Sequence, residues 1–231
     1  MNAETPARTS TQTAIAVEVW SDLACPWCYI GSRRLEQAVT AFAQDGATPP
    51  VDVTYRSFQL MPDLPDDYPG STVDLLVQAK GIPADQVAQM HDHVSGIAAE
   101  VGLRYDFAAQ RPANTLKAHQ VLHLAAVRGV QRDATERLFA AHFTEGRHIG
   151  RDDELAALGA DVGLDPEEIR QVLAEGTYAA AVRRDIDDAR ELGISGVPFF
   201  VLDRRYGVSG AQPVEVLTGA LGRAAADHAD V

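Results

Sequence analysis

The sequence predicts an α/β protein in which a β-α-β unit and a later β-β-α unit flank a long block of helices. Three observations lead to this prediction. Apolar runs typical of strands lie near both ends of the 231-residue chain, and apolar residues at helical spacing follow the first run. Between the two ends, glycines close a series of helix-like segments.

The first unit covers residues 15–60. Residues 15–20 are apolar and rich in β-branched side chains, which predicts a strand, and the alternation over residues 51–58 predicts a second one. Between them, apolar residues recur at helical spacing from Pro26 to Phe42. A proline suits the first turn of that helix because its missing N–H is not needed there. Two strands joined by one helix are expected to pair in parallel.

Residues 61–193 predict a large all-helical insertion after the second strand. Three prolines within residues 61–70 indicate a loop. The expected helices, which show no repeat unit, span residues 71–80, 83–101, 114–128, 132–145, 152–161, 165–175 and 177–192. The second unit follows, with strands at residues 198–202 and 206–209 and an amphipathic helix at residues 214–226.

Composition argues against several classes of partner. The formal net charge of -13 disfavours binding to nucleic acid or to an anionic membrane surface, because like charges repel. The sequence has neither a run of membrane-spanning length nor the apolar stretch of a secretory signal. Residues 1–14 are rich in Thr, Ala and Ser and predict a disordered tail. We therefore expect a cytoplasmic protein.

Cys25-Pro26-Trp27-Cys28 contains the only two cysteines of the chain, at the junction of the first strand and helix. A C-x-x-C pair in a β-α-β context is typical of a thioredoxin-type redox site. The unpaired N–H groups and the dipole at the helix start favour a thiolate at Cys25, so we expect Cys25 to be the nucleophile. Cys28, one turn inside, would be the resolving thiol. Two cysteines without compactly spaced histidines predict no zinc site.

The cysteine pair lies within a longer block, residues 21–31, and four further blocks accompany it: residues 56–60 with Pro62, Asn114-Thr115 with Ala118-His119, residues 193–198 and residues 208–213. With them, the chain resembles the DsbA-like thioredoxin superfamily and, within it, the FrnE type of disulfide oxidoreductase. The resemblance runs from residue 17 to about residue 220. It implies a thioredoxin-like domain formed by residues 15–60 and 194–231, with residues 61–193 as a helical insertion domain. Met61 departs from the pattern, which implies Asn at that position.

The resemblance also implies which residues surround the dithiol. The Val197–Pro198 peptide bond would be cis, with Pro198 lying against the cysteines and the backbone of Val197 pairing with an extended substrate. Pro26 and Trp27 belong to the motif. Trp27 is expected either to contact substrate or to pack against the helical insertion.

Four polar residues are weaker candidates. Asp22 is expected to be a turn or capping residue, with proton transfer as the alternative role. Asn114 can cap a helix, and His119 on that helix is a candidate substrate contact. Strand alternation predicts that Glu18 points away from the core.

Three functions remain open. The leading one is a thiol–disulfide oxidoreductase that forms, reduces or isomerises disulfides of proteins, peptides or low-molecular-weight thiols. It would use a mixed disulfide at Cys25, with glutathione as a candidate co-substrate and no bound cofactor. The alternative is a glutathione-dependent isomerase or transferase acting on a small aromatic compound, like the 2-hydroxychromene-2-carboxylate isomerases, which characteristically carry Ser in place of the first cysteine. The third is a binding or chaperone module with incidental cysteines.

Overall fold

The computed structural model describes residues 13–44, 46 and 48–229. The chain begins with β1 (Ile15–Ser21), α1 (Pro26–Gln44) and β2 (Val51–Ser57), and it ends with β3 (Phe199–Leu202), β4 (Tyr206–Ser209) and α9 (Val214–Ala229). The helices between them are α2 (Thr72–Lys80), α3 (Ala84–Glu100), α4 (Leu116–Val127), α5 (Gln131–Phe143), α6 (Asp152–Ala160), α7 (Pro166–Glu175) and α8 (Ala179–Glu191). This order confirms the predicted α/β fold. The expected disordered tail falls mainly on residues 1–12, which lie outside the described part of the chain.

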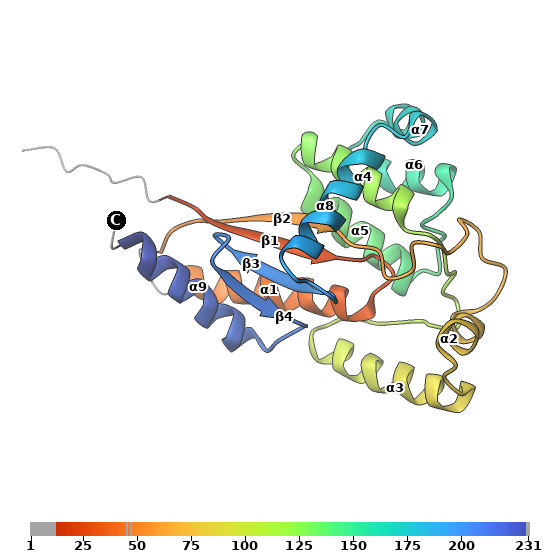
Figure 1. Cartoon of the computed structure of the whole chain (residues 1–231), viewed down its shortest axis with the longest axis horizontal. Coiled ribbons are helices and arrows are strands. Elements are labelled where there is room, and N and C mark those ends of the chain that lie inside the picture. The colour runs from red at the N-terminus through yellow and green to blue at the C-terminus, as the bar shows by residue number, and fades with distance from the viewer. Residues whose placement is uncertain (1–12, 45, 47, 230–231) are drawn as a thin grey trace, which may run out of the picture.

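The strands form one mixed sheet in the order β2-β1-β3-β4 (Figure 1). β1 and β2 run parallel, as predicted, with Ile15 opposite Val51. β3 runs antiparallel to both β1 and β4. In the β1–β3 register Trp20 lies opposite Phe199, so the segment before β3 arrives beside the end of β1. The sheet thereby brings the second half of the chain next to the cysteine motif.

α1 and α9 pack together over one face of the sheet (Figure 1). Alternate residues of β1 enter this core, where Val17 and Val19 meet Phe200 of β3 and Leu221 of α9. Burial of each large apolar side chain contributes about 1.5–3 kcal/mol. This core holds α1 against the sheet from Leu35 onward. The start of α1, with both cysteines, belongs instead to a larger core that it shares with the helices of the insertion.

α8 covers the opposite face of the sheet, where Trp20 packs with Ala189 and Val201. The indole Nε1–H of Trp20 also donates to the carbonyl of Asp185 at 2.8 Å. α8 lies within the predicted insertion, yet it packs on β2 as well as on α4. The division of the chain at residue 193 therefore stays a prediction.

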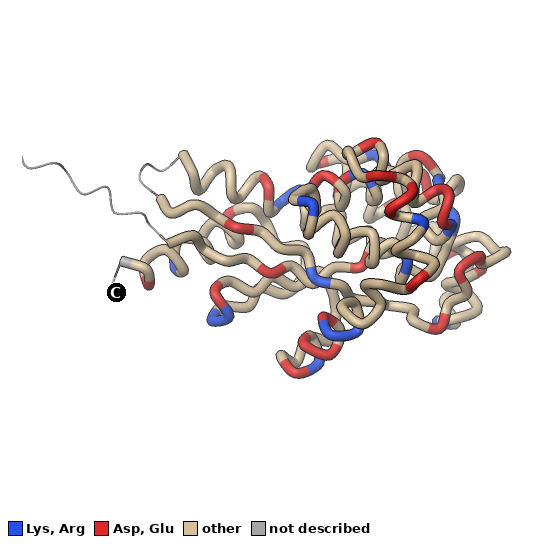
Figure 2. Tube along the Cα trace, turned by 90° about the horizontal axis from the view of Figure 1, so that it is seen from above, with Lys and Arg blue, Asp and Glu red and all other residues tan. Residues whose placement is uncertain are grey.

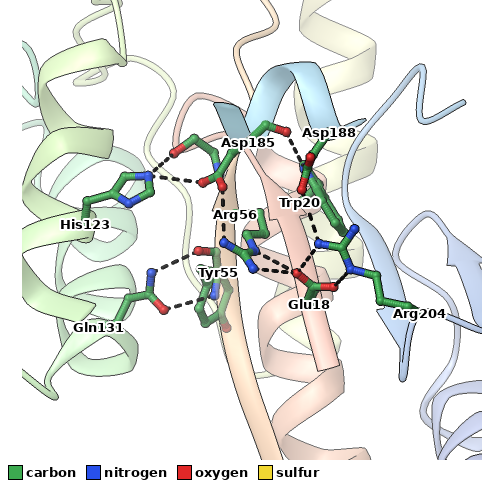
Figure 3. Close-up of polar contacts among 10 residues, drawn as sticks. Glu18, Trp20, Tyr55, Arg56, His123, Gln131, Asp185, Asp188 and Arg204 are labelled. Carbon is green, nitrogen blue, oxygen red and sulfur yellow. Dashed lines mark hydrogen bonds and ion pairs between the residues drawn. The ribbon is translucent and has the colours of Figure 1, made fainter. Parts of the chain in front are cut away.

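A network of charged side chains fills the junction between the sheet and the helices (Figure 3). Glu18 points away from the core formed by α1 and α9, but it is buried on the other face. Its carboxylate pairs with Arg56 at 2.6 Å and also with Arg204. Arg56 in turn lies 3.3 Å from Asp185, which also contacts His123 of α4 at 3.1 Å. The network thus links β1, β2, α4 and α8.

α2 and α3 form a pair beside the start of α1 (Figure 1). Ser71 caps α2 through a reciprocal pair of hydrogen bonds with Asp74. No residue of α2 is fully buried. Apolar side chains of α2 can therefore line a cavity between the α2–α3 pair and the cysteine motif.

Acidic residues outnumber basic ones, and both are scattered over the helices and loops (Figure 2). None of the helices within the described ranges is long and apolar enough to cross a membrane.

Candidate active site

Cys25 and Cys28 lie where β1 passes into α1. The backbone N–H of Cys25 donates to the carbonyl of Asp22, and the N–H of Cys28 donates to the carbonyl of Cys25, each at 3.0 Å. Both thiols are free, and the residues are 5% and 1% exposed. Cys25 lines a cavity, whereas Cys28 is not among the described residues that line it. Cys25 is therefore the cysteine that faces the cavity.

Burial raises the pKa of Cys28 well above its ordinary value, and the hydrogen bond and charge of the neighbouring Cys25 sulfur add to the increase. Hydrogen bonds from the backbone of Asp22 and the side chain of Ser21 lower the pKa but do not offset the burial. Cys28 is therefore held as a neutral thiol at neutral pH.

The segment before β3 contacts the dithiol. The Val197–Pro198 peptide bond is cis, and the carbonyl oxygen of Val197 lies 3.7 Å from the sulfur of Cys25. α1 approaches this segment closely because residue 31 is glycine. A Cβ atom on Gly31 would lie 2.9 Å from Cγ of Pro198. Sequence reasoning singled out Val197 and Pro198, and the β1–β3 pairing brings them to the cysteines.

Tyr105 supports the first turn of α1 and was not predicted from the sequence. Its hydroxyl donates to the carbonyl of Pro26 at 2.7 Å. Its ring belongs to an aromatic cluster in which Tyr29 stacks on Phe139 with centroids 4.9 Å apart. Tyr105 lies between α3 and α4 in a segment without strand or helix periodicity, so no sequence signal pointed to this contact.

A cavity of about 480 Å³, which we call the dithiol cavity, lies between the cysteine motif and the α2–α3 pair. Apolar side chains make most of its wall, among them Leu64, Leu75, Leu76, Val94, Phe107 and Phe143. Trp27, Leu60 and Met90 also line it and are 37%, 42% and 49% exposed. Met61, the departure from the family pattern, lies on the same wall.

Asp22 is buried and lies on the wall of the dithiol cavity. Its carboxylate accepts from the N–H of Leu60 at 2.7 Å and from the N–H of Ala24 at 3.3 Å. These bonds fit the expected turn role, because they tie the loop after β2 to the turn before Cys25. His119 lies 3.6 Å from this carboxylate, but its ring nitrogen is closer to the carbonyl of Phe58, at 3.0 Å.

Asn114 fastens the loop after β2 to the start of α4. Its side-chain N–H groups donate to the carbonyls of Pro62 and Leu64, each at 2.8 Å, and its oxygen accepts from the N–H of Leu116 at 2.9 Å. Thr115 occupies the cap position, one residue after the predicted one. Neither Asn114 nor His119 is among the described residues that line the dithiol cavity. The structure thus places both behind the wall, where they hold the loop, and a substrate contact by His119 stays a prediction.

His142 of α5 is a cavity residue that sequence reasoning missed. It is 2% exposed, its ring lines the dithiol cavity, and its Nδ1 has no hydrogen-bond partner among the described residues. Burial lowers the pKa of His142 from 6.5 to about 4, so the ring is neutral at pH 7. A buried histidine in an amphipathic helix has no distinguishing spacing, which is why the sequence did not indicate it.

The lowered pKa of His142 predicts a loss of stability in acid. The unfolded chain binds a proton near pH 6.5, but the native ring binds one only near pH 4. Stabilisation is therefore present above pH 6.5 and is lost as the pH falls through the native pKa. When the pH falls from 7.5 to 4.5, the free energy of unfolding of the wild type should decrease by about 2–3 kcal/mol more than that of His142→Phe. Urea unfolding at several pH values measures the difference, with exposed His93→Phe as the control that should follow the wild type.

Comparisons with known proteins agree with this geometry. The chain matches the family described as DSBA-like thioredoxin domain over residues 16–222. It is 27% identical over 190 residues to the Bacillus subtilis (strain 168) protein YwbO. The aligned region covers 81% of this chain and 86% of YwbO. The crystal structure of a probable DsbA oxidoreductase from Streptomyces coelicolor is 42% identical, with a TM-score of 0.84 over 91% of this chain and 89% of the other.

Two more distant structures share the fold. A 2-hydroxychromene-2-carboxylate isomerase is 16% identical, with a TM-score of 0.65 over 93% of this chain and 98% of the other. The cytosolic disulfide reductase DsbM from Pseudomonas aeruginosa, solved with glutathione, is 22% identical, with a TM-score of 0.60 over 90% and 98% of the two chains.

Proposed function

Because the chain belongs to the DSBA-like thioredoxin domain family, we propose that it is a thiol–disulfide oxidoreductase that acts through a mixed disulfide at Cys25. The observation that carries the proposal is the unequal placement of the two sulfurs. Cys25 lines the dithiol cavity, and Cys28 lies behind it with a raised pKa. One thiol is thus placed to meet a reactant and the other to react only after it.

In the reductive direction, the thiolate of Cys25 attacks one sulfur of a substrate disulfide. A Cys25–substrate disulfide forms, and the other half of the substrate leaves as a thiolate that takes up a proton. Cys28 then loses its proton and attacks the sulfur of Cys25, which releases the second half as a thiol. The substrate gains two electrons, the protein ends with a Cys25–Cys28 disulfide, and a thiol reductant restores the dithiol. Oxidation of a substrate dithiol is the reverse sequence.

Pro198 and Val197 would hold the reacting chain. Val197 presents its backbone 3.7 Å from the Cys25 sulfur, where an extended peptide can pair with it. Proline at the next position offers no N–H, so it leaves the sulfur without a competing backbone donor. The partners of the protein would be protein, peptide or low-molecular-weight thiols and disulfides, in the cytoplasm, with no bound cofactor.

Two observations place the glutathione-dependent isomerase below this proposal. Its characteristic serine is replaced by Cys25, and a second thiol lies directly behind. The described residues on the cavity wall include neither Lys nor Arg to receive the carboxylates of glutathione. The role of glutathione would then be that of a reductant in bulk solution.

Trapping of the mixed disulfide tests the proposal. Cys28→Ser removes the resolving thiol, so the protein should retain one substrate half as a stable adduct on Cys25 after reaction with a peptide disulfide. Intact-mass spectrometry and peptide mapping measure the adduct, which dithiothreitol should release. The paired change of both cysteines to serine is the control and should form none. Absence of an adduct from Cys28→Ser at neutral pH would rule out the mechanism.

A further inference from the structure

The dithiol cavity has the size and surface of a small-molecule site. Cavities that bind such ligands measure about 300–1,000 Å³ and are mostly apolar with a few polar groups. The cavity measures about 480 Å³. Aromatic rings contribute to its wall, including Trp27, Phe107 and Phe143, and His91 stacks on Phe107 with ring centroids 3.9 Å apart. Such a wall favours an aromatic occupant, which can pack edge to face or in an offset stack.

The charged residues of the wall disfavour anionic occupants. Of the described lining residues, only Asp22 is an acid and none is Lys or Arg. Three histidines also line the cavity. Burial lowers the pKa of His91 and His142, so these two rings do not supply a positive charge at neutral pH, and the third, His93, is exposed to solvent at the rim. A carboxylate here would lose its water without gaining an ion partner, which is costly. The net charge of -13 adds a general repulsion of anions.

The mouth of the cavity is apolar as well. Three of the exposed large hydrophobic residues in the described part of the chain, Trp27, Leu60 and Met90, line this one cavity. Grouped exposed apolar residues mark a binding surface more often than scattered ones do. Cys25 lies on the wall with them, so an occupant of the cavity meets the nucleophilic sulfur.

On the premise of the proposed function, we infer that the dithiol cavity binds an uncharged aromatic group attached to the sulfur of a low-molecular-weight disulfide. The bound group places its sulfur at Cys25. Attack forms the Cys25–substrate disulfide and releases an aromatic thiolate, and Cys28 then displaces the retained aromatic thiol from Cys25. The disulfide is thus reduced by two electrons to two thiols, and the protein becomes oxidised. A thiol of the cell is the reductant for the next cycle.

Two aromatic disulfides of opposite character test the inference. Dithiodipyridine is uncharged at pH 7.5, whereas dithiobis(nitrobenzoate) carries two carboxylates. Stopped-flow absorbance gives the rate of each with the reduced protein in a single turnover. The rate with dithiodipyridine is divided by the rate with dithiobis(nitrobenzoate). This ratio is then divided by the same ratio measured for mercaptoethanol, a thiol without a binding site, to remove the difference in intrinsic reactivity of the two disulfides. We expect the protein to favour dithiodipyridine at least tenfold by this measure, and to favour it also over the uncharged aliphatic hydroxyethyl disulfide.

A charge placed at the mouth should change this preference. Met90→Arg puts a cation on the wall at a half-exposed position, so the preference for dithiodipyridine should fall at least fivefold. Leu60→Arg places the same charge on the wall from another segment of the chain. It provides a second test if Met90→Arg does not fold. Val127→Arg is the matched control, because Val127 is 64% exposed and is not among the described lining residues. Its preference should equal that of the wild type, and circular dichroism checks the fold of all three.

The outcomes separate the inference from the function beneath it. Equal normalised rates with all three disulfides would leave the oxidoreductase intact and overturn the inference. A preference seen only for a peptide disulfide with a neighbouring phenylalanine would assign the cavity to a peptide side chain and also overturn it. Failure of every disulfide to react at Cys25 would instead reject the proposed function itself.

Discussion

Cys25→Ser is expected to reduce disulfide exchange at least about a thousandfold, to the level of the background reaction. Only a thiolate attacks a disulfide sulfur at a useful rate, and a serine hydroxyl is not ionised at neutral pH. Cys28 cannot take over the first step, because it lies behind Cys25 and its pKa is raised. Insulin reduction with dithiothreitol and oxidation of a dithiol peptide measure the two directions.

The fold of Cys25→Ser should be unchanged, because both cysteines are free and serine differs from cysteine by one atom. Far-UV circular dichroism and thermal unfolding provide that check. Cys28→Ser is the informative comparison. It should complete the first attack but fail to turn over, whereas Cys25→Ser should fail at the first step. Turnover by Cys25→Ser at the wild-type rate would show that the sulfur assigned as nucleophile is not the one that reacts.

Asp185→Asn is expected to destabilise the protein by about 2–4 kcal/mol. The carboxylate of Asp185 accepts from the N–H of Ser57 at 2.9 Å and lies within ion-pair distance of His123 and Arg56 (Figure 3). An amide keeps the size of the side chain but leaves these donors with one neutral oxygen. This loss of stability is smaller than the loss expected for a fully buried ion pair, because the side chain of Arg56 is 32% exposed. For a chain of this length, the melting temperature should fall by about 2–4 °C for each kcal/mol.

The same helix offers a matched control for this change. Asp187 also lies on α8 and pairs with Arg190, but both side chains are more than half exposed. Asp187→Asn should therefore cost less than about 0.5 kcal/mol. Equal effects of the two substitutions would show that the network in Figure 3 contributes no more than a surface ion pair.

The effect of Asp185 should also depend on pH with a defined sign. Burial opposes its charge, but the hydrogen bonds from His123 and Ser57 and the charge of Arg56 outweigh burial and lower its pKa below 3.8. A lowered native pKa stabilises the fold above the unfolded value and ceases to do so as the pH falls through the native value. The difference between the wild type and Asp185→Asn should therefore be full at neutral pH and shrink below pH 3.8.

The secondary structure could be predicted because its signals are local. The strand runs, the proline at the start of α1 and the glycines after the helices each act within a few residues, and the observed elements follow them closely. Cys25 and Cys28 could be identified for the same reason, since the motif and its place before a helix lie in one short segment. Val197 and Pro198 needed the family resemblance, because composition alone does not tell a cis proline from a trans one.

The wall of the dithiol cavity could not be predicted, because its residues come from segments far apart in the chain. His142 of α5 and Met90 of α3 have the same local pattern as any residue of an amphipathic helix. Glu18 shows the limit of alternation. Its direction was predicted, but not that α8 and two arginines would bury it.

By itself, the sequence determined the order of strands and helices and the position of a cysteine pair at a helix start, because hydrogen-bonding and periodicity rules operate over neighbouring residues. Only the tertiary structure decided that Cys25 faces a cavity and which residues form the wall of that cavity. The reason is physical: burial and the charge of a wall depend on residues that only packing brings together, and these two quantities set the reactivity of a thiol and the polarity of its substrate.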